Sequence, residues 1–420
     1  MTSGTAGKPS QRDKCTIILP ISQDEYEQIV HKPKQFRAWI DKNYRRHPEI
    51  FPKNFTGKYT LHDRKTSEKT GLMTRRIELN NGEKDEAWSV LPSFMMPYMT
   101  GYTKEVAVAL YYRKWGVPYE GLVYGFGRDE NYWYRMETQF GRLSIVATTV
   151  KTTEIPVDLL ADEHHSKING DKVAIATTVT HGVVLGAEVC AGFTKDELKA
   201  GYEVFAMEAK AVEPNYIPST VNTDGYAATI GAWLTLFPTA ILIRCFLHAW
   251  LRIRDRSKTL ANFFELGEKV WDVYYSPTRR MMSQRIRRLR DWAMKNVSGV
   301  ALEKTLDLCE KQAEWSLWYD HEHAYTTSNE WDRLMRSQNR YFDRGQHLHG
   351  TLESANLRSR SWAVLHNYWD WGRKAQKANE GYRCPAERLN EKRYADCWLE
   401  NLLVATSAVP SRKKTPLNPA

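Results

Sequence analysis

The sequence lacks the motifs of several common protein classes, and each absence narrows its function. Its six cysteines form no Cys-x-x-Cys pair, so neither a zinc finger nor a disulfide framework is expected. No glycine-rich phosphate loop and no Ser/His/Asp arrangement is recognisable, which argues against nucleoside triphosphatases and serine hydrolases. The longest apolar stretch, residues 232–250, is interrupted by proline, arginine and histidine, so no membrane span is expected.

Positive charge and aromatic rings are abundant instead. Lys and Arg total 60 against 50 for Asp and Glu, an excess of 60 − 50 = 10, and the chain has 15 Trp and 22 Tyr. A basic balance favours an anionic polymer such as DNA, because each neutralised phosphate releases counterions. A basic enzyme without a polymer ligand is the alternative. The rings are suited to a protein core, to base stacking, or to both.

Residues 101–150 show a pattern of short helices. Three helix-length pieces, 104–114, 119–124 and 129–139, are separated by turns that contain Gly116 and Gly127. Two short helices joined by a glycine-containing turn, followed by a polar helix, indicate a helix-turn-helix, although an ordinary helical hairpin has the same pattern. The polar side chains that the third helix would offer to a DNA groove are those of Arg128, Asn131, Tyr132 and Arg135.

From residue 157 strands and helices alternate. The predicted elements are strands at 157–162, 171–179 and 182–190, a helix at 194–210, a strand at 219–224, a helix at 226–236, a strand at 240–245 and a helix from about 246. Three strands, helix, strand, helix, strand, helix is the element order of the ribonuclease H-like fold. A helical segment rich in Arg, Trp and Leu follows over 258–325.

Acidic residues lie where this fold would bring them together. Asp162 ends the first predicted strand and Asp224 ends the fourth, and these two strands are neighbours in such a sheet. A third acid, Asp332, lies one turn into a predicted helix that Thr327 or Ser328 can cap. Carboxylates at convergent positions can hold the paired divalent cations that phosphodiester transfer uses.

Each acid has a competing interpretation. Glu163 could replace Asp162 as the ligand, and Asp224 before a glycine could be only a helix cap. Glu330, on the same turn as Asp332, and Glu353 further on compete for the third position. We favour Asp162, Asp224 and Asp332 as the catalytic and metal-binding residues.

Two further motifs accompany these acids. Cys245 and His248 form a Cys-x-x-His pair on the next strand and helix, and Asn329, Asp332 and Arg333 form an Asn-x-x-Asp-Arg motif. Together with the Asp-Gly step after the second acid, they resemble the DDE transposases of insertion sequences, especially the Mutator-like group. That group carries Asp-Gly, Cys-x-x-His and an Asn-x-x-Glu-Arg third-acid motif behind a helical insertion.

The resemblance covers roughly residues 157–371. Asp332 departs from it, since the family usually has Glu there, but Asp is also a hard oxygen ligand. Cys245 and His248 are spaced like half of a zinc site with no second pair, so we expect them to pack beside the metal pocket. In the basic helical segment, Arg285 and Arg288 are expected to contact the DNA backbone.

The resemblance implies cleavage at transposon ends and strand transfer into target DNA. Its implied cofactor is Mg²⁺, with Mn²⁺ as a substitute, and its implied partner is double-stranded DNA, both terminal inverted repeats and target. A homo-oligomer on DNA and a cytoplasmic, nucleoid-associated location in a prokaryotic cell follow, with no membrane partner. The rivals are another ribonuclease H-like nuclease, such as a junction resolvase, and a host-adopted DNA-binding regulator derived from a transposase.

We therefore expect an α/β fold: a ribonuclease H-like mixed sheet with an all-α insertion, preceded by a helical DNA-binding region. The expected segments in chain order are a disordered N-terminus (1–20), a small α/β unit with a hairpin turn at Asn81–Gly82 (21–100), the helix-turn-helix region (101–150), the first part of the catalytic core (151–258), the helical insertion (259–325), the remainder of the core (326–404) and a flexible tail (405–420).

Overall fold

The computed structural model describes residues 15–80, 85–345 and 347–409. The chain forms two compact units, Met1–Glu154 with Arg340–Ala420, and Ile155–Asn339. Each unit contains one β-sheet together with helices, so the chain has a mixed α/β architecture. Within the ranges described, no helix has the length and apolar character needed to cross a membrane.

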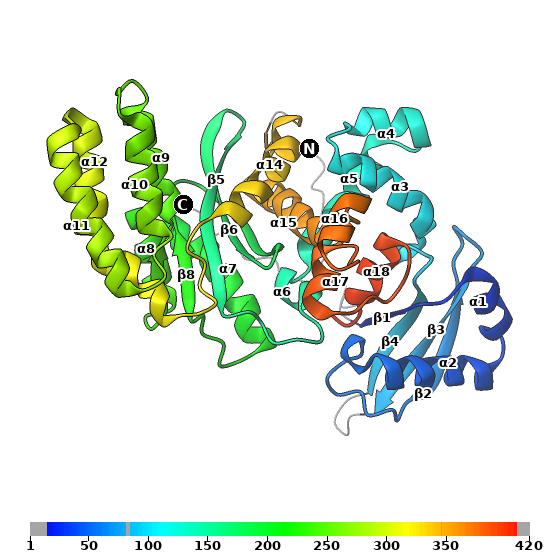
Figure 1. Ribbon diagram of the computed structural model, residues 1–420. Helices are drawn as coiled ribbons and strands as arrows, with labels where there is room; N and C mark the ends of the chain where they lie inside the picture. Colours follow the sequence, from blue (N-terminus) through cyan, green and yellow to red (C-terminus); the bar gives the residue numbers. More distant parts are fainter. Residues whose placement is uncertain (1–14, 81–84, 346, 410–420) are drawn as a thin grey trace. The chain divides into compact units, whose positions relative to one another are not determined.

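The first unit contains a four-stranded sheet of order β1-β4-β3-β2, in which β1 runs parallel to β4 and the other pairs are antiparallel. Its strands and the two helices beside it are β1 (Thr16–Leu19), α1 (Gln23–Ile29), α2 (Pro33–Arg46), β2 (Thr60–Thr66), β3 (Met73–Asn80) and β4 (Asp85–Pro92) (Figure 1). Tyr26 and Phe36 are fully buried between these helices and the sheet. The Tyr26 hydroxyl donates to the main-chain oxygen of Met73 on β3.

The first residues depart from the prediction in one respect. Thr16–Leu19 form a strand, whereas the sequence suggested disorder up to residue 20. The reason is that this apolar run pairs with β4, where Ile17 and Leu19 become fully buried. The predicted turn at Asn81–Gly82 and residues 1–14 lie outside the described residues.

Helices make up the rest of the first unit. They are α3 (Thr103–Lys114), α4 (Tyr119–Phe126), α5 (Glu130–Thr138), α6 (Ile145–Thr149), α15 (Leu352–Tyr368), α16 (Arg373–Ala378), α17 (Pro385–Asn390) and α18 (Trp398–Ala405), with 3₁₀ turns at Pro48–Ile50, Pro97–Met99 and Gln139–Arg142. Helix α15 packs here through its buried Arg360, which donates to the main-chain oxygens of Gly141 and Leu143. The C-terminal helices thus group with the N-terminal segments, where the sequence had suggested the catalytic core.

The second unit contains a five-stranded sheet of order β7-β6-β5-β8-β9. Its elements are β5 (Asp158–Ile168), β6 (Asp171–Thr180), β7 (Val183–Cys190), α7 (Lys195–Val212), β8 (Thr220–Thr223), α8 (Ala227–Leu236) and β9 (Ile241–Arg244). The first three strands are antiparallel, whereas β8 and β9 run parallel to β5. Helix α7 packs closely on the sheet, since a Cβ at Gly201 would lie 2.4 Å from Cys190 Sγ.

Strand β5 is longer than predicted, so Asp162 lies within it and not at its end. The polar run after Asp162 stays extended because β6 pairs with it as far as Ile168. The hairpin closes through Asn169 and Gly170, which both have positive φ, 52° and 100°, as the tight hairpin turns require. The pairing of β5 with β8, by contrast, is recorded only as far as Leu160, two residues before Asp162.

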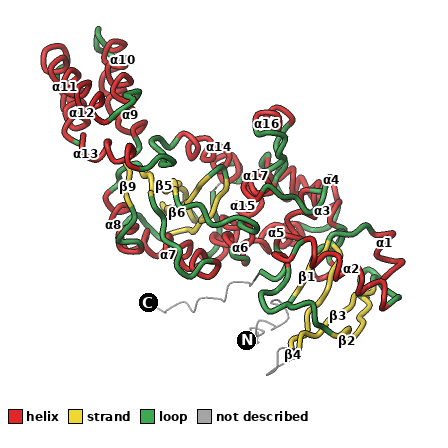
Figure 2. Tube along the Cα trace, turned by 60° about the horizontal axis from the view of Figure 1, so that its bottom comes forward, coloured by secondary structure: helices red, strands yellow, loops and turns green. Residues whose placement is uncertain are grey.

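A helical segment follows β9 and stands beside that edge of the sheet in both views (Figures 1 and 2). It comprises α9 (Phe246–Ser257), α10 (Phe263–Tyr274), α11 (Arg279–Asn296), α12 (Gly299–Glu310), α13 (Gln312–Trp315) and a 3₁₀ turn (Ser316–Asp320), and α14 (Asn329–Asp343) comes next. The segment has its own apolar core, to which Trp315 and Trp318 contribute. These two rings therefore serve packing, which was one of the two roles the sequence allowed.

Candidate active site

Asp162 lies on β5, and Asp224 directly follows the last residue of β8, the parallel strand next to β5. The β5–β8 register pairs Asp158 with Thr220 and Leu160 with Asn222. Continued by two residues, the same register sets Asp162 opposite Asp224. Burial, followed by the negative charges of Asp224 and Glu163, raises the pKa of Asp162 well above its ordinary value. The two carboxylates therefore repel each other in a poorly solvated place, which a cation would relieve.

The Asp-Gly step after β8 has a local structural reason. Gly225 has φ +87°, in the left-handed region where a side chain is strained. This turn lets Asp224 Oδ1 accept a hydrogen bond of 2.7 Å from the main-chain N–H of Tyr226, which precedes α8. Only Oδ1 of Asp224 therefore acts as a cap at the start of α8. Within the described residues, no side-chain donor to the other oxygen is recorded.

Glu163 points to the opposite face of the sheet, as alternation along a strand requires. Its Oε1 accepts hydrogen bonds from the hydroxyls of Tyr202 on α7, at 2.6 Å, and Thr229 on α8, at 2.7 Å. Those donors hold the carboxylate in place beneath the two helices. The geometry therefore brings Asp162, and not Glu163, to the face shared with Asp224.

The alternatives to Asp332 lie elsewhere. Glu330 accepts a hydrogen bond from the main-chain N–H of Gly182, in the turn between β6 and β7. Glu353 is an exposed residue of α15, in the first unit. Asp332 is therefore the one of these three acids whose recorded contact leads to the Cys245–His248 pair.

Cys245 and His248 lie beside the two strand acids. The β8–β9 register pairs Thr223 with Arg244, so its continuation sets Cys245 next to Asp224. Burial would lower the pKa of His248, but the hydrogen bond and charge of Cys245, together with Asp162 and Asp224, raise it to about 9. The imidazole is thus held in its cationic form near pH 7, where it partly offsets the charge of the two acids.

Ser328 connects this pair to the third acid, a role that the sequence analysis missed. Cys245 Sγ and Ser328 Oγ lie at hydrogen-bond distance, 3.2 Å, and Ser328 Oγ lies 3.5 Å from His248 Nδ1. The Ser328 hydroxyl also donates to Asp332 Oδ2 at 3.4 Å. The i, i+4 spacing of Ser328 and Asp332 was the available signal, because it sets both on one side of a helix. From the sequence, Ser328 was expected only to cap the helix that carries Asp332.

The donor set fits a divalent cation held by two carboxylates. Mg²⁺ is commonly bound through one or two carboxylates, with water and substrate phosphate completing its shell. Asp162 and Asp224 supply that number. Over the described part of the chain, no group of three or more His, Cys, Asp or Glu side chains is placed to hold a metal ion. In the described structure Asp332 is therefore connected to the site through Ser328 and is not placed as a third metal ligand beside Asp162 and Asp224.

The three helices of residues 103–138 expose most of the predicted DNA-contacting residues. Arg128, Asn131 and Arg135 are exposed; the four-residue spacing of Asn131 and Arg135 sets these two on one face of α5, whereas Arg128 lies in the turn before the helix, with φ 65°. Tyr132 is half-buried and its hydroxyl donates to the main-chain oxygen of Thr100, so it serves packing more than the surface. A buried ion pair between Arg113 and Glu137, at 2.8 Å, joins α3 to α5.

The two arginines singled out on α11 differ in their surroundings. Arg285 donates to the main-chain oxygen of Asp272 on α10 at 2.6 Å and pairs with its carboxylate at 3.2 Å. Arg288 is exposed on the same helix. Arg285 therefore joins two helices of the segment, whereas Arg288 faces solvent.

No protein-family model matches the chain, and no curated protein matches it either.

Proposed function

We propose that this chain is a DNA transposase that cleaves transposon ends and transfers the freed strand into target DNA, using a ribonuclease H-like core. The observation that carries the proposal is the nearness of Asp162, on β5, to Asp224, directly after the neighbouring parallel strand β8, because the negative charge of Asp224 raises the pKa of Asp162. The strand order β7-β6-β5-β8-β9 and the helical segment between β9 and Asp332 support the same assignment.

The side chains of the site have separate tasks in this proposal. Asp162 and Asp224 would hold Mg²⁺, and bound Mg²⁺ activates the attacking oxygen and stabilises the leaving oxygen of a phosphodiester. Cationic His248 would offset part of the negative charge that Asp162 and Asp224 bring together. Ser328 contacts both Asp332 and His248 and so keeps Asp332 near the metal-binding pair. Asp332 would be the third acid of the transposase. Mn²⁺, another hard cation, is expected to replace Mg²⁺ at carboxylate ligands.

DNA recognition is assigned to exposed residues of both units. Arg128, Asn131 and Arg135 would contact the terminal inverted repeats, with α3 to α5 acting as a helix-turn-helix. Arg288 would contact the phosphate backbone. Since two transposon ends must be joined, we expect a homo-oligomer on DNA in the cytoplasm of a prokaryotic cell, associated with the nucleoid.

The test uses a plasmid that carries the coding region with its natural flanking DNA. Purified protein in Mg²⁺ should make breaks at defined positions on both sides, and sequencing of the broken ends maps them. EDTA and an Asp224→Ala variant should abolish the breaks while leaving DNA binding intact. Breaks that persist undiminished in Asp224→Ala would overturn the enzyme assignment.

One observation favours a second candidate, a DNA-binding regulator that has lost cleavage. That observation is the absence, among residues whose structure is described, of a third metal ligand beside Asp162 and Asp224. The same experiment separates the two candidates. A regulator would bind the flanking DNA with wild-type and Asp224→Ala proteins alike and would break neither plasmid.

A further inference from the structure

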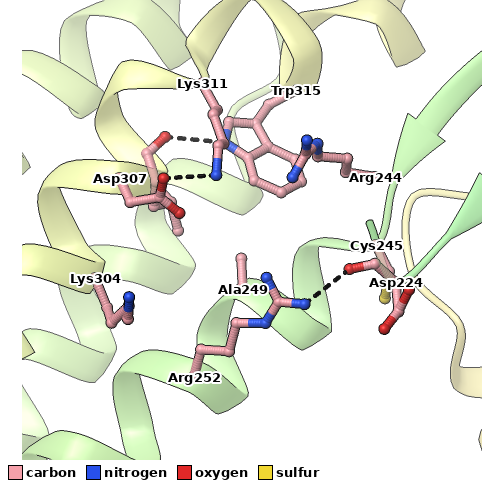
Figure 3. A pocket seen from close by; sticks show the side chains of 10 residues that line it. Asp224, Arg244, Cys245, Ala249, Arg252, Lys304, Asp307, Lys311 and Trp315 are labelled. Carbon is pink, nitrogen blue, oxygen red and sulfur yellow. Dashed lines mark hydrogen bonds and ion pairs between the residues drawn. The ribbon is translucent and has the colours of Figure 1, made fainter. Parts of the chain in front are cut away.

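A small basic pocket opens beside Asp224, between the sheet and the helical segment (Figure 3). Its cavity measures about 20 Å³, enough for one water molecule or for one oxygen of a larger anion. Ten residues from β8–β9, α9, α12 and α13 line it: Asp224, Arg244, Cys245, Ala249, Arg252, Lys304, Asp307, Leu308, Lys311 and Trp315. Four of the ten are cations and two are carboxylates.

Two of the four cations are already neutralised within the segment. Arg244 pairs with Glu314 on α13. Lys311, directly after α12, pairs at 2.5 Å with Asp307, one turn earlier. Trp315, which also lines the pocket, is held by a hydrogen bond of 2.9 Å from its Nε1 to the main-chain oxygen of Leu308.

The other two cations are bound more weakly. Arg252 is exposed, and its recorded contact is a 3.3 Å hydrogen bond to the main-chain oxygen of Asp224. Lys304 pairs at 2.7 Å with its neighbour Glu303, whose side chain is 66% exposed. Such an exposed pair is worth about 0–1 kcal/mol, so Lys304 can leave it at little cost. Both cations are thus available to an incoming anion.

We infer that Arg252 and Lys304 bind a DNA phosphate that neighbours the phosphate cleaved at Asp162 and Asp224. This inference rests on the proposed function and assigns a positioning role to residues that the sequence analysis did not select. Arg252 comes from α9 and Lys304 from α12, so the helical segment would help to fix the DNA strand. The Arg252 guanidinium donates to the main-chain oxygen of Asp224, so a phosphate bound by Arg252 would lie next to that acid (Figure 3).

The size and charge of the pocket favour a phosphate over a base. A cavity of about 20 Å³ excludes a nucleobase but accepts a phosphate oxygen from a strand that passes over its mouth. Once a divalent cation neutralises Asp224, the charge of the pocket becomes more positive. Arginine can meet a phosphate with two parallel hydrogen bonds, and lysine adds a point charge.

A first experiment needs no cleavage. The affinity for a duplex of unrelated sequence is measured by fluorescence anisotropy over a range of salt concentrations, for wild type, Arg252→Ala, Lys304→Ala and Lys210→Ala. Lys210 is the matched control, an exposed lysine of α7, which covers the Glu163 face of the sheet, and it does not line the pocket. We expect the salt slope to fall by about 1 in Arg252→Ala and Lys304→Ala and to stay unchanged in Lys210→Ala. Unchanged slopes in both pocket variants would overturn the inference.

A second experiment locates the phosphate. Duplexes that end at the mapped break carry one uncharged methylphosphonate at successive positions beside the cleaved phosphate. In wild type, one position should lower affinity and cleavage by about 3–10-fold. In Arg252→Ala that same modification should cost nothing further, because the cation and the charge it binds are both gone. Arg252→Lys should recover part of the loss.

The outcomes separate the two proposals. If wild type makes breaks and the losses from Arg252→Ala and from every methylphosphonate simply add, the positioning role is wrong and the transposase assignment stands. If wild type makes no breaks but the salt slopes fall as expected, the pocket binds phosphate and the transposase assignment fails. Lys304→Ala repeats the coupling test on a side chain whose recorded contact is its exposed neighbour Glu303, so misfolding of an Arg252 variant does not block it.

Discussion

Two consecutive acids on β5 meet opposite surroundings. Glu163 lies beneath α7 and α8, where two hydroxyls donate to one of its oxygens. Asp162 lies on the other face, opposite a second aspartate and near a cationic histidine. Both are buried, at 6% and 9% exposure, so burial alone does not distinguish them.

The two carboxylates differ in the groups that surround them. A buried acid that receives hydrogen bonds from hydroxyls is satisfied, and it stabilises the packing of the helices that supply them. A buried acid that faces another acid stays unfavourable until a cation arrives, which is the arrangement expected of a metal site. Replacing one acid at a time should show this difference in activity and in stability.

The largest effect should separate Asp162 and Asp224 from Glu163. Asp162→Asn and Asp224→Ala should lower DNA cleavage in Mg²⁺ by about 10³-fold or more, since cation binding contributes several kcal/mol to the transition state. Glu163→Gln should keep cleavage within about tenfold of wild type, because its amide oxygen still accepts from Tyr202 and Thr229. Equal losses in Glu163→Gln and Asp224→Ala would contradict the assignment of the two faces.

A smaller effect should distinguish the two acids on the first turn of α14. Asp332→Asn should lower cleavage by about 10–100-fold, since it loses its charge next to Ser328 and His248. Glu330→Gln should leave the cleavage rate close to that of wild type, because Glu330 contacts the β6–β7 turn instead. The cleavage rates are compared at saturating Mg²⁺. A larger loss in Glu330→Gln than in Asp332→Asn would mean that Glu330, and not Asp332, is the third acid.

Protein stability should change in opposite directions at the two faces of β5. Glu163→Ala should lower the free energy of unfolding by about 1–3 kcal/mol, because it leaves two buried hydroxyls without their acceptor. Asp162→Asn should raise it on the order of 1 kcal/mol in EDTA, because it removes a strained charge. Urea unfolding at pH 7 measures both.

The stability gained in Asp162→Asn should depend on pH. The pKa of Asp162 is raised in the folded protein, so the ionised carboxylate subtracts stability above that pKa. The gain from Asp162→Asn should therefore shrink as the pH falls through the raised pKa. It should vanish below the ordinary value of 3.8, where the carboxyl is protonated in both states. A gain that persists unchanged at low pH would point to packing as its cause.

The smallest effect concerns the two arginines of α11. Arg288→Ala should lower the salt slope of DNA binding by about 1 and leave stability unchanged. Arg285→Ala should instead lower stability by about 0.5–1 kcal/mol, because its contacts with Asp272 join α10 to α11. Thermal unfolding and binding assays on both variants show whether the roles are reversed.

The sequence predicted the order of strands and helices in the second unit well, because β-branched runs and turn residues are local signals. It set Asp162 at the end of a strand, and the error arose because β6 extends β5 through long-range pairing that a single strand does not reveal. It grouped the C-terminal helices with the core, whereas the buried Arg360 joins them to segments more than two hundred residues earlier.

Parts of the site could not be predicted for the same reason. Asp162 and Asp224 were predicted because each follows an apolar run, which is visible locally. Ser328 and Arg252 were not, since their contacts depend on how α9 packs against α14 and against the end of β8. A serine next to a helix start and an arginine among many have no distinctive pattern in sequence.

The most direct measurement is the binding of Mn²⁺, followed by electron paramagnetic resonance, to wild type and to single variants without DNA. We expect Asp162→Asn and Asp224→Asn each to weaken Mn²⁺ binding by at least about tenfold, and Glu163→Gln to leave it unchanged. Binding that is equally strong in all four proteins, or that is lost in Glu163→Gln alone, would contradict it.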